Sequence, residues 1–64
     1  MDMERLASLY QKRYNITNEL NRITDELLVS SERQDNVSMD LLLDMREECI
    51  HNLEQNEMEV REMV

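Results

Sequence analysis

The chain has 64 residues and contains no glycine, no proline, no tryptophan and no phenylalanine. A chain of this length forms at most one domain, and its core is marginal without disulfides, a metal or a partner. Because most tight turns need glycine or proline, the composition argues against β-hairpin folds and against glycine-rich loops that bind phosphate. The 15 acidic and 7 basic residues give a net charge of −8, so we expect no nucleic-acid partner and no membrane partner.

Apolar stretches are short, and the sequence has a single cysteine, Cys49. The longest apolar runs, Leu27–Val29 and Leu41–Leu43, have three residues each, whereas a membrane-spanning helix needs about 20. Asp2 and Glu4 stand where a secretory signal peptide would carry basic residues. One cysteine provides no disulfide framework. These features favour a cytoplasmic protein.

Apolar residues between Leu6 and Leu27 recur mainly in steps of three and four. This spacing is a heptad repeat, labelled a to g, whose a and d positions form one seam of a helix. The a positions are 6, 13, 20 and 27, the d positions are 9, 16 and 23, and Arg13 is the one charged residue among them. With Asp2 as its cap, we predict a helix over about residues 2–32.

The repeat stops in the polar stretch from Ser30 to Asn36. Asp35 and Asn36 favour bends because their side chains can bond nearby backbone N–H groups. We therefore predict a turn at about residues 33–36.

A second heptad repeat extends from Met39 to Met63. Its a positions are 39, 46, 53 and 60, and its d positions are 42, 49, 56 and 63. The repeat predicts a helix over about residues 37–62, with Asn36 or Ser38 as the N-cap.

The fold predicted from these elements is all-α, an antiparallel two-helix hairpin, because a short turn makes consecutive helices neighbours. A turn centred between residues 34 and 35 brings together residues whose numbers add to about 69. Leu27 then faces Leu42, and Arg13 faces Asn56 and Glu57, so polar residues interrupt both seams at one level. Alternatively, the Arg13 side chain extends out of the seam into solvent.

The apolar stripes are wider than a two-helix seam because e positions are apolar as well. A stripe of this width suits three or four helices, so we predict a homodimer in which two hairpins form a four-helix bundle. The alternative is that the extra apolar surface binds a client helix. The residues expected on this dimer or partner face are Tyr10, Tyr14, Leu28, Leu41, Leu43, Met45 and Ile50.

One pattern could bind a metal, because Glu48 and His51 stand three residues apart, as in di-metal carboxylate bundles. Their c and f positions point away from the seam, whereas the ligands of such centres point inward. We therefore expect no metal and no cofactor, with a dimeric di-metal protein as an alternative. Cys49 lies at a d position directly after two glutamates, which favours a small buried side chain over a nucleophile. With no catalytic set in view, we predict that the chain is not an enzyme.

The segment from Leu41 to Glu54 reads LLLDMREECIHNLE. With a long first helix and a short polar turn before it, this segment resembles the second helix of flagellar type III export chaperones of the FlgN/FliT type. The resemblance implies an all-helical cytoplasmic chaperone that holds the terminal helix of a secreted flagellar subunit. Such chaperones usually continue with further helices, whereas this sequence stops at Val64, so the resemblance leaves open whether a dimer replaces them.

The sequence is compatible with three functions. The first is a non-enzymatic helical interaction protein, of export-chaperone type, that holds a partner helix in an apolar groove. The second is a dimeric, ferritin-like di-metal carboxylate protein that uses Glu48 and His51. The third is a small acidic coiled-coil regulator that binds a basic protein through residues 37–62.

Overall fold

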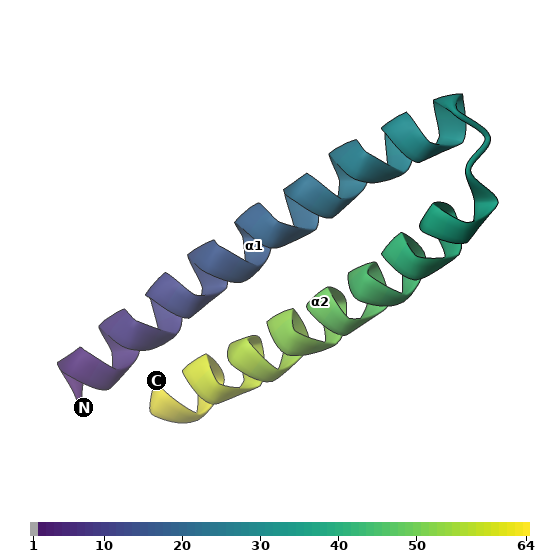
Figure 1. Cartoon of the computed structure of the whole chain (residues 1–64). Coiled ribbons are helices and arrows are strands. Elements are labelled where there is room, and N and C mark those ends of the chain that lie inside the picture. The colour runs from purple at the N-terminus through teal and green to yellow at the C-terminus, as the bar shows by residue number, and fades with distance from the viewer. Residues whose placement is uncertain (1) are drawn as a thin grey trace.

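The chain folds as two long antiparallel helices, as predicted (Figure 1). The structure is a computed structural model that describes residues 2–64. Helix α1 covers Met3–Glu32 and helix α2 covers Asn36–Met63, and within the described residues there is no strand. Both helices begin and end within one residue of the predicted bounds. The N-terminal and C-terminal ends of the hairpin lie together, opposite the turn (Figure 1).

An aspartate caps the start of each helix. Asp2 accepts a hydrogen bond from the backbone N–H of Arg5 at 3.1 Å, as predicted for α1. Asp35 caps α2 and accepts from both the backbone N–H of Ser38, at 3.1 Å, and its hydroxyl, at 2.7 Å. The predicted caps for α2, Asn36 and Ser38, were therefore wrong. Asp35 takes the position because its two carboxylate oxygens can satisfy two donors at once.

The turn between the helices is a Schellman motif, built without glycine. The backbone N–H of Gln34 bonds to the carbonyl of Ser31, and the N–H of Asp35 bonds to the carbonyl of Ser30. This pair of bonds satisfies carbonyls that the end of α1 would otherwise leave free. It requires a left-handed residue, and Gln34 has φ 56°. The chain therefore turns in three residues, 33–35.

The core is a narrow line of side chains between the two helices. Ile23 is 1% exposed, and it packs with Leu42 and Cys49 in the most buried cluster. Four partly buried side chains surround this cluster: Ile16, Leu20, Leu27 and Met45. The hairpin measures 49 × 14 × 11 Å, so each helix packs against one neighbour only. No helix within residues 2–64 has the length and apolar character to cross a lipid bilayer.

A hydrogen bond made by Asn56 shows how the two helices are aligned, and this alignment differs from the predicted one. Its side-chain amide donates to the carbonyl of Leu9 at 2.8 Å, and the Cys49 thiol lies 3.8 Å from the carbonyl of Ile16. In both pairs the residue numbers add to 65, as they do for the Ser30–Asp35 bond of the turn. The predicted sum of 69 differs by four residues, so the predicted alignment is shifted by about one helical turn. The reason is the Schellman motif, which sets Asp35 beside Ser30. Each further pair in the seam follows at an interval of seven residues on both helices.

Arg13 does not face Asn56. Its side chain is exposed, which agrees with the alternative that it extends into solvent. Glu57 instead forms a salt bridge with Arg61 of the same helix, at 3.6 Å. The buried polar side chains of the seam within residues 2–64 are Asn56 and Ser30, whereas Arg13 and Arg46, at a positions, are exposed.

Candidate interaction surface

The two sides of the hairpin can be assigned from heptad positions. At about 100° per residue, the e and g positions of a helix lie on opposite sides of its a/d seam. A groove near the turn is lined by Glu26 of α1, by Arg33 directly after α1, and by Ser38 and Met45 of α2. All four continue the g positions of their helices. The g positions of both helices therefore share one flank of the hairpin, and the e positions share the opposite flank.

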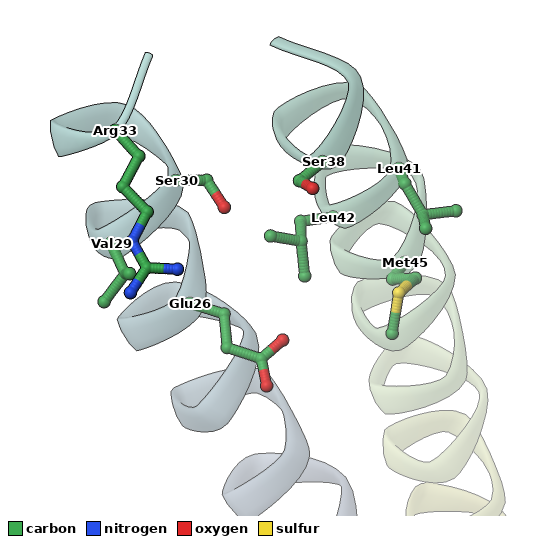
Figure 2. A pocket seen from close by; sticks show the side chains of 8 residues that line it. All are labelled: Glu26, Val29, Ser30, Arg33, Ser38, Leu41, Leu42 and Met45. Atoms are coloured by element: carbon green, nitrogen blue, oxygen red, sulfur yellow. The ribbon is translucent and has the colours of Figure 1, made fainter. Parts of the chain in front are cut away.

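The groove near the turn has a volume of about 390 Å³ and lies between the end of α1 and the start of α2 (Figure 2). Ser30 and Leu42 each point toward the opposite helix. Leu41 supplies an apolar wall on α2 and is 62% exposed. The residues that line the groove are Glu26, Val29, Ser30, Arg33, Ser38, Leu41, Leu42 and Met45.

Charged side chains line this same flank along α1. Arg22 bonds to Glu19 and, at 2.5 Å, to Glu26. The hydrogen bond from Arg22 lowers the pKa of the Glu19 carboxyl and raises that of the guanidinium. A smaller groove of about 200 Å³ follows, with Glu19 and Glu48 in its wall. We call this side the charged flank, defined by Glu19, Arg22, Glu26, Arg33 and Glu48.

The opposite side of α1 carries a second stripe with no charge along its whole length. Its members occupy the e and b positions, in alternating steps of four and three, and every one of them is exposed. We call this stripe the uncharged flank, and it consists of Met3, Ala7, Tyr10, Tyr14, Thr17, Asn21, Thr24, Leu28 and Ser31. The middle of the stripe lies about 100° around α1 from the side that packs on α2.

Helix α2 borders the uncharged flank with an apolar edge and then an acidic row. Leu43 and Ile50 occupy e positions, with Leu43 46% exposed and Ile50 half-buried. The b positions beyond them are Asp40, Glu47, Glu54 and, at the end of the helix, Arg61; all four are exposed and three are acidic. The broad uncharged surface therefore has acids along one rim.

The seven residues predicted for a single face divide between the two flanks. Tyr10, Tyr14 and Leu28 belong to the uncharged flank, and Leu43 and Ile50 form its α2 edge. Leu41 and Met45 instead line the groove of the opposite flank (Figure 2). The prediction placed all seven on one face because it was based on apolar character outside the seam alone. It did not separate the e side of the seam from the g side. The signal that it missed is the lack of charge at the b positions of α1.

Cys49 is packed as an apolar residue. Burial, and secondarily the nearby Glu19 and Glu48 carboxylates, raise the pKa of its thiol, which suppresses the reactive thiolate. Glu48 and His51, the pair weighed as metal ligands, are both exposed. Within residues 2–64, no group of three or more His, Cys, Asp or Glu side chains is arranged to hold a metal ion.

Comparisons of the chain with protein-family models, with curated proteins and with solved structures gave no match. The surface itself is therefore the basis for the functional proposal.

Proposed function

We propose that this chain is a non-enzymatic helical interaction protein that binds further helices on its uncharged flank. The observation that carries the proposal is the row of nine exposed, uncharged residues at heptad spacing along α1. A helix face that stays in contact with solvent ordinarily carries charged residues along its length, as the charged flank does. A face without charge at heptad spacing is instead the form of a helix that packs against another helix.

Large side chains on this flank provide the contact surface. Tyr14 and Leu28 are each 62% exposed, and Tyr10 is 49% exposed. Aromatic side chains contribute much of the binding free energy in protein interfaces because they bury a large area with few rotatable bonds. Tyrosine also keeps a hydroxyl that can stay hydrated at the edge of the contact. These properties suit a helix that binds reversibly.

The form of association that we propose is a homodimer, in which two hairpins complete a four-helix bundle. A bundle of this kind covers the stripes that one hairpin leaves exposed. An export chaperone that holds a client helix is a narrower form of the same proposal. It is supported by the resemblance of residues 41–54, which also motivates a cytoplasmic location.

The proposal can be tested by placing a charge on the uncharged flank. Tyr14→Glu introduces a carboxylate into the middle of the stripe, while Asn15→Glu adds the same charge at the next residue, which lies on the other side of α1. Tagged wild-type chain and the Asn15→Glu variant should copurify with the same bound protein, including a second copy of the chain. Tyr14→Glu should lose it. Equal recovery with both variants would show that the flank is not the binding surface.

A further inference from the structure

We infer that the occupant of the uncharged flank is a second copy of the chain, with the two α1 helices antiparallel about a two-fold axis at Thr17. This assignment rests on the proposed function, because both use the same flank. It adds the direction of pairing, the position of the axis and the residues that meet. Most soluble homo-oligomers are closed by such two-fold axes, in which one patch meets its own copy.

The order of side chains along the stripe is self-complementary in size. With Thr17 opposite Thr17 of the second copy, the residues that meet have numbers adding to about 34 or 35, as two antiparallel heptad seams require. Each remaining layer then joins a large residue to a small one: Met3 with Ser31, Ala7 with Leu28, Tyr10 with Thr24 and Tyr14 with Asn21. Alternation of large and small residues across facing positions fills the space between helices evenly.

Parallel pairing lacks this property. Every residue would then meet its own copy, so that Tyr14 would lie against Tyr14 and Ala7 against Ala7. Crowded layers would alternate with empty ones, and both overpacking and cavities destabilise a contact. The size pattern therefore favours the antiparallel direction.

Two-fold symmetry also determines where the α2 helices go. Both lie on the same side of the α1 pair, which produces an antiparallel four-helix bundle. Leu43 and Ile50, on the α2 edge of the flank, then face the second hairpin. The acidic rows of the two α2 helices also approach each other, and their like charges oppose the pairing. With about a dozen residues per copy against the usual 20 to 30 per side, the dimer is reversible.

Two matched cysteine variants test the direction of pairing. Thr17 and Thr24 both occupy e positions, both are exposed, and each donates its hydroxyl to the carbonyl four residues earlier at 2.9 Å. In the antiparallel dimer, the two copies of residue 17 meet, whereas the two copies of residue 24 lie about 20 Å apart along the bundle at 1.5 Å per residue. The probe is a short bis-maleimide cross-linker applied to each purified full chain.

We expect Thr17→Cys to form covalent dimers at least about tenfold faster than Thr24→Cys, because its two thiols are held at high effective concentration. Mixing Thr24→Cys with Tyr10→Cys should restore rapid cross-linking, since these positions meet. The wild-type chain, with its thiol buried at Cys49, gives the background rate, and Asn15→Cys on the other side of α1 should match it.

Each other outcome overturns the inference in a recognisable way. Equal, rapid cross-linking of Thr17→Cys and Thr24→Cys would indicate parallel pairing. Background rates for both, with a chain that sediments as a monomer, would exclude a second copy as the occupant. The proposed function would still hold after that result if the chain bound another protein and Tyr14→Glu abolished the binding. It would be wrong as well if Tyr14→Glu and Asn15→Glu recovered the same amount of bound protein.

Discussion

Gln34 occupies a backbone conformation that usually belongs to glycine. It is the one non-glycine residue with positive φ in the described part of the chain, at 56°, and the Schellman motif needs that conformation to close the turn. A side chain with a Cβ atom is disfavoured there by steric contact with the backbone. The chain thus makes the turn between its two helices at a conformational cost that glycine would avoid.

We predict that Gln34→Gly stabilises the hairpin by roughly 0.5–1 kcal/mol, because it removes this steric cost. Urea denaturation measures the change, with the helix content followed by circular dichroism at about 222 nm. Gln34→Ala is the matched control and should leave the stability nearly as it is, since alanine retains Cβ. A glycine variant less stable than the alanine variant would contradict this account of the turn.

Asp35, next to Gln34, makes the start of α2 sensitive to pH. Hydrogen bonds from the Ser38 hydroxyl and backbone N–H lower the pKa of its carboxyl. A lowered pKa in the folded state means that the cap stabilises α2 fully above the unfolded-state value of about 3.9. That stabilisation is lost as the pH falls through the lower, folded-state value.

The variant Asp35→Asn isolates this effect, since asparagine caps helices about as well and does not titrate. Between neutral pH and about pH 3, the wild type should lose stability relative to the variant. Thermal melting of both proteins at each pH gives the comparison, in which all other carboxyl groups are common to the two chains. Melting temperatures that shift in parallel would show that the cap does not depend on the charge.

Asn56 acts at the scale of the two helices, because it joins α2 to α1. It is 1% exposed, its Nδ2 donates to the Leu9 carbonyl, and its Oδ1 has no hydrogen-bond partner within residues 2–64. A buried polar atom without a partner is destabilising. A single buried asparagine nevertheless specifies alignment, since a shifted helix would leave its whole amide unpaired.

We predict that Asn56→Leu raises the stability by about 1 kcal/mol, because leucine has the same branched shape and leaves no polar side-chain atom in the seam. Asn52→Leu, one turn away and exposed, is the control and should change the stability little. Asn56→Asp should act in the opposite direction and unfold much of the chain, since an uncompensated buried charge costs about 3 kcal/mol or more. Unfolding in urea distinguishes all three; a leucine variant less stable than wild type would show that the amide is a net stabilising group.

The sequence predicts the helices better than their alignment. Heptad spacing predicts where α1 and α2 lie, because apolar residues at a and d positions share one face only when the chain is helical. The alignment depends on the left-handed conformation of Gln34, and glutamine gives no sign of it. For the surface, apolar residues such as Tyr14 and Leu28 could be selected from sequence. Separating them from Leu41 and Met45 required knowing on which side of the seam each residue lies in the folded hairpin.

At the scale of the whole molecule, charge opposes the association that the uncharged flank favours. Each chain carries a net charge of −8, and residues 37–64 hold eight acids against two arginines. In the two-fold dimer the acidic rows of both α2 helices lie on the same side. Salt screens repulsion of this kind, since the Debye length falls from about 10 Å at 0.1 M to about 3 Å at 1 M.

We therefore predict that the dimer fraction, measured by sedimentation equilibrium at one protein concentration, rises as sodium chloride increases from about 0.1 M to about 1 M. Apolar contact is not weakened by salt in this range, so relief of repulsion decides the direction. Tyr14→Glu is the control and should stay monomeric throughout, because it adds a carboxylate at the centre of the contact. A wild-type dimer fraction that falls with salt would instead indicate attraction between opposite charges. The contact would then involve the charged flank, where arginines and glutamates alternate, rather than the uncharged one.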